Sequence, residues 1–285
     1  MNFFKPRPKI GLALGCGGPK GLAHIGVIKV LEQNNIPIDY IAGTSIGALI
    51  GGFYAAKKNI AEIEHIAIDI GWRQAFSFLF EPTLRQGLIK GDKLKKFIEN
   101  YIGQTTFKEL KIPFSAVATD LKTGKKVILR HGPVANAIRS SISIPIILQP
   151  VATDETFLAD GGISCPVPVE VVKKMGADLV IAVNLNTDCR LDIKNKKYGF
   201  SRIANNSLSI LGYNLADENA KNADLVICPK VGHISWRKLF TREGSLEGIK
   251  IGEETTTLLI SKLKRVLDKE ENPIIKLFNN IFRHH

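Results

Sequence analysis

The sequence predicts an α/β protein built around a parallel sheet, and two observations support this prediction. Short apolar runs of strand length alternate with longer runs of helical periodicity along most of the chain. In addition, two strand–loop–helix units follow one another within residues 9–56, and parallel strands require crossovers of this kind. A strand is still predicted at 224–228, so we expect one sheet that grows late into the chain.

The bulk composition fits a globular protein with a basic surface. The chain has 285 residues, 45% apolar and 23% charged, and a formal net charge of +12. Such a surplus favours anionic surfaces such as nucleic acid or acidic lipid headgroups, although it also suits a merely solvated surface. The four cysteines show no CxxC pair or metal-ligand spacing, so we expect reduced thiols and no metal site; they are Cys16, Cys165, Cys189 and Cys228.

The N-terminal region imitates a signal peptide without matching one. Basic residues precede the apolar run 10–16, but this region also contains two prolines and several glycines. The longest uncharged window, 40–56, has 17 residues and four glycines, which makes it a poor membrane span. We therefore expect a cytoplasmic protein that could contact a membrane peripherally.

The first predicted strand, 9–14, runs into a glycine-rich loop at 15–21 and then a helix at 22–33. Such a loop leaves backbone N–H groups free and directs them at an anion. The Walker A spacing is absent, which argues against a nucleoside triphosphate. Gly15, Gly17 and Gly21 give a variant of the dinucleotide pattern, but that fold needs an acidic residue at the end of the second strand. The remaining anion is the transient oxyanion of acyl transfer.

The second predicted strand, 38–42, leads into Gly43-Thr44-Ser45-Ile46-Gly47 and then an apolar helix at 48–56. A serine between strand and helix, with Gly43 and Gly47 two residues to either side, is typical of a nucleophile elbow. The glycines would be needed because a side chain there would crowd a neighbouring element. The alternative is an ordinary turn whose serine caps the helix.

The two loops should be neighbours. Consecutive parallel strands joined by right-handed crossovers place their following loops at the same, C-terminal edge of the sheet. The loop after the first strand supplies amide donors, and the loop after the second supplies the hydroxyl of Ser45.

This pair of motifs resembles the patatin-like phospholipases, in which a G-G-G-x-[RK]-G loop precedes G-x-S-x-G by about 25 residues. Here the loop is Cys16-Gly17-Gly18-Pro19-Lys20-Gly21, so Cys16 replaces the first glycine and Lys20 occupies the basic position. The resemblance implies a three-layer α/β/α sandwich with a mainly parallel sheet. It also implies an oxyanion hole formed by the loop residues Gly17, Gly18, Pro19 and Lys20.

The middle of the chain contains a predicted helix at 61–70 and an amphipathic helix at 92–101. Between them, 72–80 packs four aromatic residues into nine, which suits either an acyl-chain cleft or a plug between helices. Strands at 113–119 and 126–129 form a predicted hairpin. A helix begins at 134, and the serines that follow it up to Pro145 could touch substrate, although helix-end capping is the simpler role.

A short strand at 156–159 is followed by Asp160-Gly161-Gly162. A carboxylate on a glycine turn at the end of a strand is well placed to enter a site. The resemblance implies more, because the family carries its catalytic aspartate in a D-G-[GA] motif, which matches at Asp160. A helix through Met175 and a strand at 179–184 complete a core that we assign to residues 9–186.

Residues 187–285 are predicted to form a C-terminal extension that completes the sheet. A basic stretch at 187–202, either a loop or a membrane-binding patch, precedes a helix ending at 220 and the strand at 224–228. A helix is predicted at 246–267. Beyond Pro273, the apolar face of 274–282 could dock on the core or lie in a membrane interface.

A serine nucleophile requires a base. A Ser45–Asp160–His233 triad is formally possible but disfavoured, because in α/β-hydrolases several strands precede the serine, whereas here only one strand precedes its own. His24 is expected to pack or cap. The resemblance implies a Ser45–Asp160 dyad that cleaves acyl esters of phospholipids or lysophospholipids with no cofactor or metal. The competing hypotheses are a dinucleotide-dependent enzyme and a non-catalytic lipid-binding protein; no nucleic-acid partner is expected.

Overall fold

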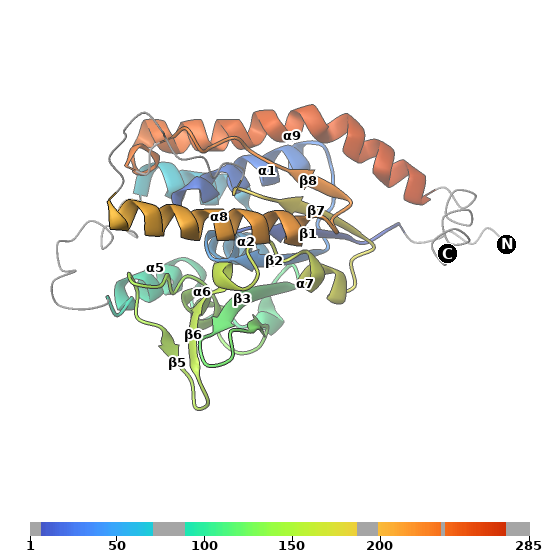
Figure 1. The fold of residues 1–285 in the computed structure, drawn as a ribbon. Coiled ribbons are helices and arrows are strands. Elements are labelled where there is room, and N and C mark those ends of the chain that lie inside the picture. The colour runs from blue at the N-terminus through green and yellow to red at the C-terminus, as the bar shows by residue number, and fades with distance from the viewer. Residues whose placement is uncertain (1–6, 71–88, 187–198, 235–236, 272–285) are drawn as a thin grey trace, which may run out of the picture.

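The computed structural model describes residues 7–70, 89–186, 199–234 and 237–271 (Figure 1). The aromatic stretch at 72–80, most of the basic stretch at 187–202 and the apolar face at 274–282 therefore lie outside the described residues. The strands are β1 (Ile10–Leu14), β2 (Tyr40–Thr44), β3 (Phe114–Asp120), β4 (Lys126–Leu129), β5 (Val151–Ala152), β6 (Phe157–Asp160), β7 (Leu179–Val183) and β8 (Leu225–Ile227).

These strands form one mainly parallel sheet. Its hydrogen-bonded order is β5-β6-β3-β2-β1-β7-β8, with β4 paired to β3. The pairs along β3-β2-β1-β7-β8 are parallel, whereas β4, β5 and β6 pair antiparallel. The late strand β8 extends the same sheet, as the sequence predicted.

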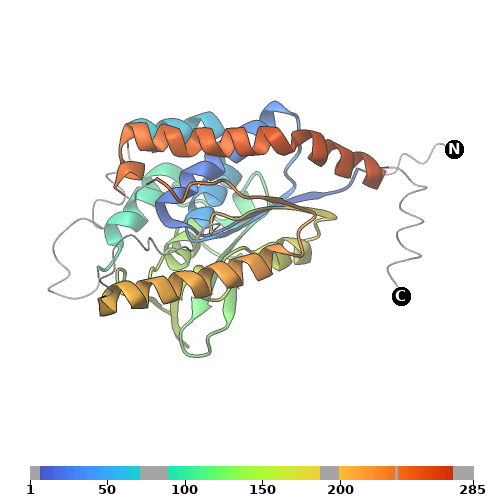
Figure 2. The same ribbon diagram turned by 45° about the horizontal axis from the view of Figure 1, so that its top comes forward.

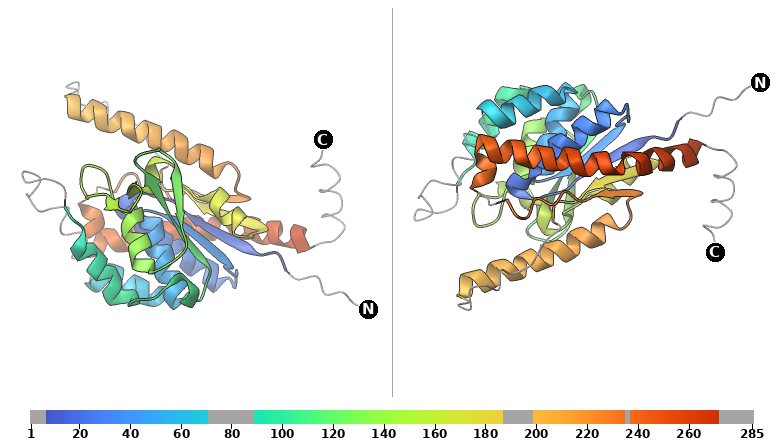
Figure 3. Two further views of the ribbon diagram at one scale, coloured as in Figure 1. Left: turned by 90° about the horizontal axis from the view of Figure 1, so that it is seen from below. Right: turned by 90° about the horizontal axis from the view of Figure 1, so that it is seen from above.

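Helices cover both faces of this sheet. They are α1 (Leu22–Gln33), α2 (Ile46–Lys57), α3 (Ile60–His65), α5 (Asp92–Ile102), α6 (Val134–Ser141), α7 (Val169–Lys174), α8 (Phe200–Ala220) and α9 (Arg242–Glu271). Figure 2 shows α9 and α8 on opposite sides of the strands, and Figure 3 shows α8 set apart from the other helices. The result is the predicted α/β/α sandwich.

The core divides along the two faces of the sheet because side chains alternate along a strand. Leu12 and Leu14 of β1 belong to the larger cluster, which also contains residues of α1, α2, α5, α6 and α9. Ala13 and Ala42 belong to the smaller cluster with α7 and the C-terminal end of α8.

Several predicted elements agree closely with the structure. Helix α1 and strand β4 have the predicted bounds, and β3 and β4 form the predicted antiparallel pair. Strand β2 begins two residues later than predicted and continues to Thr44, directly before Ser45. The helix predicted at 61–70 divides into α3 and a π-helical turn at Ile66–Ile70. The two-residue strand β5 was not predicted because it is too short to show a period.

The register of β3 brings two distant segments end to end. Strand β2 pairs with β3 as far as Thr44–Val117, and β6 pairs with β3 from Asp160–Ala118 onward. Strand β4 pairs with residues of β3 that also pair with β2 or with β6. Because each strand has two sides, β4 must lie on the opposite side of β3 from both. Strands β2 and β6 therefore lie on one edge of β3 and meet where Ser45 follows Thr44 and where β6 ends at Asp160.

Candidate active site

Ser45 stands at the turn between β2 and α2. Its backbone dihedrals, φ 57° and ψ −121°, lie outside the ordinary regions for a residue with a side chain. A Cβ on Gly43 would lie 2.3 Å from the carbonyl oxygen of Gly47, and one on Gly47 would lie 2.2 Å from that of Leu14. Close backbone packing therefore requires both glycines, and Ser45 itself holds a strained conformation at this strand-to-helix turn.

The hydroxyl of Ser45 is bonded to Asp160. Its Oγ lies 2.5 Å from Asp160 Oδ2, and both side chains are buried, with 4% and 7% of their residues' surface exposed. Within the described chain the hydroxyl makes no bond to helix α2, which contradicts the alternative in which the serine caps that helix. The structure brings together two residues separated by 115 positions in the sequence.

The Asp160 side chain is held in place by its own turn. Its Oδ1 accepts a hydrogen bond of 2.7 Å from the N–H of Gly162, and the 3-10 turn Gly161–Ile163 begins there. Its backbone N–H donates to Ser143 O, and its carbonyl accepts from Thr119 Oγ1. The carboxylate is thus aimed at Ser45 in the resting protein.

Burial raises the pKa of Asp160 to about 6, and the hydrogen bonds from Ser45 and Gly162 oppose this shift. Both opposing donors are neutral groups, so they offset the cost of desolvating the charge only in part. A carboxylate with this pKa is a stronger base than an ordinary aspartate while remaining mostly ionised at pH 7.

Ser141, the last residue of α6, forms a hydrogen bond with the backbone of Ser45. Its Oγ accepts the N–H of Ser45 at 2.9 Å and donates to Val117 O at 2.6 Å. Sequence reasoning missed this role. The available signal was a serine inside a helix between the buried apolar residues Ile138 and Ile142, which argues for an inward-facing hydroxyl.

The hydroxyls of the neighbouring serines bond back to backbone carbonyls of their own segment. Ser140 Oγ donates to Asn136 O, and Ser143 Oγ donates to Arg139 O, four residues back in each case. The Arg139 guanidinium also donates to Ser143 Oγ and to the backbone carbonyls of Lys90 and Gln149. These contacts fix the segment that precedes the Asp160 strand.

The glycine-rich loop forms a 3-10 helix, Gly18–Gly21, after Gly17. Among the described residues, the amides of Gly17 and Gly18 have no hydrogen-bond acceptor. They precede the first hydrogen bond of the 3-10 helix, whereas later amides bond to the carbonyl three residues back. Pro19 has no N–H and shapes the loop without donating. Gly17 and Gly18 are therefore the donors this loop can offer.

The loop packs directly on the elbow. Strand β1 pairs with β2 in parallel, Leu14 opposite Gly43, so both following loops lie at one edge of the sheet. A Cβ on Gly21 would lie 2.1 Å from the side chain of Ile46, which follows Ser45. His24 anchors the start of the loop, because its Nε2 lies 2.8 Å from Gly15 O.

Cys16, in place of the family's first glycine, lies next to the aspartate turn. Its half-buried thiol accepts from Asn186 Nδ2 at 3.3 Å and lies 3.1 Å from where a Cβ on Gly162 would be. Burial, with the nearby Asp160 charge, raises the pKa of this thiol to about 12. The thiol therefore stays protonated at neutral pH, and a protonated thiol is a poor nucleophile.

The two histidines considered as candidates lie elsewhere. Burial lowers the pKa of His24 to about 4, so it is a neutral packing residue beneath the loop. His233 is exposed and its Nε2 lies 3.5 Å from Glu247 Oε1. The Ser45–Asp160–His233 arrangement is not formed.

The dinucleotide hypothesis has little support from the geometry. Asp39 precedes β2 at the opposite edge of the sheet from the glycine loop, and it accepts hydrogen bonds from Arg7 and from the N–H of Ile10. The end of β2 carries Ser45 where that fold needs an acidic residue.

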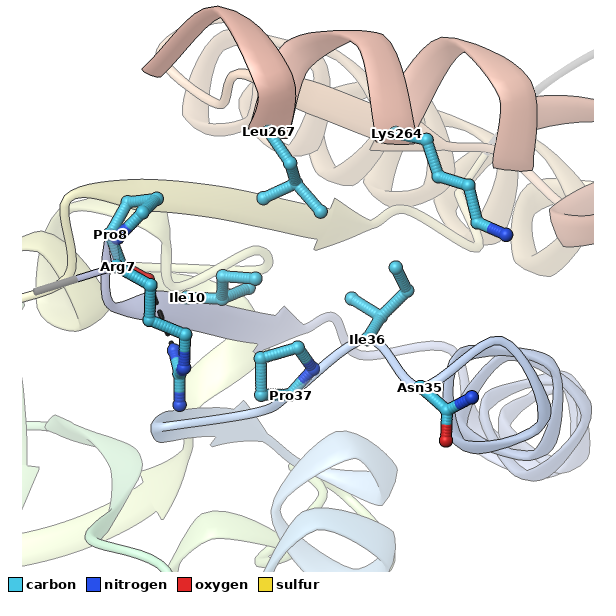
Figure 4. A pocket seen from close by; sticks show the side chains of 8 residues that line it. All are labelled: Arg7, Pro8, Ile10, Asn35, Ile36, Pro37, Lys264 and Leu267. Carbon is cyan, nitrogen blue, oxygen red and sulfur yellow. Dashed lines mark hydrogen bonds between the residues drawn. The ribbon is translucent and has the colours of Figure 1, made fainter. Parts of the chain in front are cut away.

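Other features lie away from Ser45. A cavity of about 530 Å³ opens at the N-terminal edge of the sheet, between Pro37 and Leu267 of α9 (Figure 4). The described parts of the chain hold no group of three or more His, Cys, Asp or Glu residues arranged for a metal ion. Over the same residues, no helix combines the length and apolar character that crossing a bilayer needs.

Comparison with known proteins shows the family of the chain. The family described as "Patatin-like phospholipase" matches residues 12–173. An uncharacterized NTE family protein of Mycobacterium bovis is 41% identical over 179 residues, which cover 63% of this chain and 49% of that protein. Lysophospholipase NTE1 of Scheffersomyces stipitis is 34% identical over 62% of this chain, but the match covers only 12% of that protein. The chain therefore spans half or less of the length of these relatives.

The fold is also found in a solved structure. VipD from Legionella pneumophila superposes with a TM-score of 0.54 over 90% of this chain and 67% of its own, at 15% identity. These features define a class of α/β/α sandwich proteins with a strained serine between a strand and a helix and a carboxylate against its hydroxyl. Within that class, the chain belongs to the patatin-like phospholipase family.

Proposed function

We propose that this protein is a serine acyl hydrolase that cleaves fatty-acyl ester bonds of phospholipids or lysophospholipids through a Ser45–Asp160 dyad. The observation that carries the proposal is the hydrogen bond between Ser45 Oγ and Asp160 Oδ2 in a buried site. A serine already bonded to a base, and held in an elbow conformation, is the arrangement that nucleophilic catalysis requires.

In the acylation step, Ser45 Oγ attacks the ester carbonyl carbon and its proton passes to Asp160 Oδ2. The tetrahedral intermediate collapses as the ester C–O bond breaks, and the leaving alkoxide takes the proton from Asp160. In deacylation a water molecule attacks the acyl-serine, Asp160 accepts its proton, and that proton returns to Ser45 Oγ as the fatty acid leaves.

The oxyanion would be stabilised by the amides of Gly17 and Gly18. These donors belong to a loop packed on the elbow, and the start of α2 adds its positive dipole end beside Ser45. One preorganised donor is typically worth about 10²–10³ in rate. Lys20, half-exposed in the same loop, keeps the local potential positive.

An ordinary aspartate is a weak base for a serine hydroxyl. Burial of Asp160 offsets this weakness in part. Because the pKa of Asp160 is raised to about 6, proton transfer from Ser45 is less unfavourable than it would be to an exposed aspartate. The remaining barrier is assigned to the oxyanion loop.

The lipid substrate class is supported by the family to which the chain belongs and by the relative named a lysophospholipase. The nucleophile and base lie within residues 12–173, the part of the chain that the family matches.

The proposal is tested with purified wild type, Ser45→Ala and Asp160→Asn on a soluble p-nitrophenyl acyl ester, followed by lysophosphatidylcholine and phosphatidylcholine. We expect each variant to lose at least about 10³-fold in kcat/KM. A fluorophosphonate probe should label wild type, and peptide mapping should place the label on Ser45.

Ser140→Ala provides a matched control, because Ser140 is also buried but bonds only within its own helix. Undiminished hydrolysis in Ser45→Ala or Asp160→Asn would remove the proposal. Lipid binding without hydrolysis in wild type would favour the non-catalytic lipid-binding hypothesis, and quenching of tryptophan fluorescence by a nicotinamide cofactor would favour the dinucleotide hypothesis.

A further inference from the structure

A polar cavity lies beside the strand that carries the candidate aspartate. Its volume is about 540 Å³, and its walls come from the first turn of α5, helix α6 and strands β5 and β6. These elements pack together in one part of the molecule (Figure 1). Leu158 of β6, two residues before Asp160, is part of the wall. The steps proposed above make no use of this cavity, so its polar residues need an explanation of their own.

The charged side chains on the cavity wall are mainly cationic. Among the described residues of the lining, Lys90, Lys95 and Arg139 are basic, whereas Asp92 is the one acidic residue. Lys95 shares its charge with Glu99, which lies 3.6 Å away on the next turn of α5. Lys90 is exposed and forms no ion pair within the described chain. The cavity therefore carries a surplus of positive charge, which favours an anionic ligand.

Arg139 is a buried cation without a carboxylate partner. Only 6% of its surface is exposed. Its Nη1 donates to Ser143 Oγ at 2.7 Å, and its Nη2 donates to the carbonyl oxygens of Lys90 and Gln149 at 2.5 and 3.0 Å. All three acceptors are neutral. Burial lowers the pKa of Arg139, and the charge of Asp92 opposes this shift only in part. Because a buried charge is costly unless an opposite charge compensates it, the described residues leave Arg139 short of negative charge.

The guanidinium of Arg139 also keeps a donor for a ligand. Arginine has five N–H donors in a planar fork, and the described residues supply acceptors for Nη1 and Nη2 but none for Nε. Polar side-chain atoms that are sealed from solvent and have no partner occur at His24, Tyr101 and Asn219 but not at Arg139. The unpartnered Nε is therefore accessible from the cavity that Arg139 lines.

Helix α5 adds to the positive potential at this place. Its N-cap, Gly91, has no side chain to cap the first turn, and the positive end of the helix dipole lies there. Gly91 packs closely on the guanidinium, since a Cβ on it would lie 2.4 Å from Arg139 Nε. Asp92 in the first turn supplies one negative charge. That single carboxylate is set against a helix N-terminus, a guanidinium and the ammonium of Lys90, so the balance remains positive.

We propose that this cavity binds the phosphate group of a phosphorylated ligand, with Arg139 and Lys90 as the phosphate-binding residues. Guanidinium and ammonium groups are the usual protein partners of phosphate, and a group with two negative charges offsets the positive surplus. The cavity has room for a polar group attached to the phosphate, such as glycerol. The phosphate can belong to a phospholipid headgroup or to a free phosphorylated molecule. Both sources share this chemistry, and the experiments distinguish them.

Binding is measured by isothermal titration calorimetry with glycerol 3-phosphate at constant ionic strength, with glycerol as the phosphate-free control. No ester is present, so the result does not depend on the proposed hydrolysis. Arg139→Gln would also remove structural bonds to two backbone carbonyls, so Lys90→Gln carries the test: its exposed side chain forms no ion pair in the described chain. We expect wild type to bind glycerol 3-phosphate but not glycerol, and Lys90→Gln to weaken the Kd at least about fivefold.

Lys96→Gln is the matched control. It removes the same charge from an exposed position on α5, outside the cavity lining. We expect its Kd for glycerol 3-phosphate to stay within about twofold of the wild-type value, because exposed charges away from the ligand are screened by salt.

Hydrolysis assays then distinguish the two sources of phosphate. Wild type and Lys90→Gln are compared on lysophosphatidylcholine and on a monoacylglycerol, which carries the same kind of ester without phosphate. A loss of kcat/KM on lysophosphatidylcholine alone assigns the cavity to the substrate headgroup. Equal kcat/KM on both esters, together with weaker binding of glycerol 3-phosphate, assigns it to a free phosphorylated molecule.

Three results would overturn the inference. Wild type could give no more heat with glycerol 3-phosphate than with glycerol. Lys90→Gln could bind glycerol 3-phosphate as tightly as wild type. Finally, Lys90→Gln and Lys96→Gln could weaken binding equally, which would show general attraction to a basic surface rather than a site in the cavity.

Discussion

The aspartates at the N-terminal and C-terminal edges of the central sheet have different hydrogen-bond partners. At the N-terminal edge, Asp39, Asp178 and Asp224 each precede a strand and accept the N–H of a residue at the start of the adjacent strand, Ile10, Lys9 and Val180 respectively. At the C-terminal edge, Asp160 is the last residue of strand β6 and accepts a hydrogen bond from the hydroxyl of Ser45.

The contrast between Asp39 and Asp160 lies in their partners rather than in burial alone. Burial pushes the pKa of Asp39 upward, but hydrogen bonds from Arg7 and Ile10, with the charges of Arg7 and Lys9, hold it below its usual value. For Asp160, burial prevails because its donors are neutral. A carboxylate paired with cations stabilises the fold, whereas one left with a hydroxyl is available as a base.

The largest expected effect comes from replacing each of these two aspartates by asparagine and comparing the variants. Asp160→Asn should reduce kcat/KM on a soluble ester by at least about 10³-fold, because the base is lost while the shape is kept. Asp39→Asn should retain activity and lower the free energy of unfolding by about 1 kcal/mol, the order expected of a partly exposed ion pair and a capped strand amide. Activity assays and urea unfolding at pH 7 measure both.

This pair of variants also tests whether Asp160 is kept at a cost in stability. Asp160→Asn removes a desolvated charge, so at pH 7 it should unfold at higher urea concentration than wild type. An activity loss of similar size in Asp39→Asn, or a destabilised Asp160→Asn, would show that the two edges do not differ as described.

The pH dependence sharpens the comparison. Asp160 must be ionised to accept a proton, so kcat/KM should rise with pH through about 6 and level off above it. Because the folded-state pKa of Asp160 lies above its unfolded value near 3.8, folding is favoured by the bound proton, and this contribution to stability is lost as pH rises from about 4 to about 6. The loss amounts to at most about 3 kcal/mol.

Asp39 should give the free energy of unfolding the opposite dependence on pH. Its folded-state pKa is depressed, so its contribution is present above the unfolded pKa and disappears as pH falls below about 4. Urea unfolding of wild type, Asp39→Asn and Asp160→Asn across this range separates the two terms. A wild-type stability curve parallel to that of Asp160→Asn between pH 4 and 6 would contradict the raised pKa.

Sequence reasoning proposed the elbow and the aspartate turn because both are local patterns. Glycine spacing around Ser45 reports close backbone packing, which the contacts of Gly43 and Gly47 confirm. That the loops after β1 and β2 are neighbours followed from the handedness of parallel crossovers, and the pairing of β1 with β2 agrees.

The features of the site that sequence reasoning missed depend on the register between distant segments. Nothing local indicates that β6 lies on the same edge of β3 as β2, yet this is what places Asp160 against Ser45. The role of Ser141 was missed for the same reason, because its partners are 96 and 24 residues away. The positive φ of 71° at Ile146 could not be predicted either, because a β-branched residue argues against that backbone conformation.

The smallest effect we predict concerns Ser141, which makes a structural contact at the end of the sheet that carries the proposed dyad. Ser141→Ala leaves the buried N–H of Ser45 and the carbonyl of Val117 without this partner, which should cost about 1–3 kcal/mol in the free energy of unfolding. It should also lower kcat by about tenfold with KM little changed, because a strained serine loses the bond that holds its backbone.

Ser140→Ala, one residue earlier on the same helix, removes a hydroxyl bonded only to its own helix and should change both quantities little. If Ser141→Ala reduces stability but leaves kcat intact, the hydroxyl serves the fold alone, and the elbow conformation of Ser45 is held by the sheet register and the glycine contacts. If kcat falls while Ser140→Ala remains normal, the positioning of Ser45 depends on a residue that no motif at the elbow reveals.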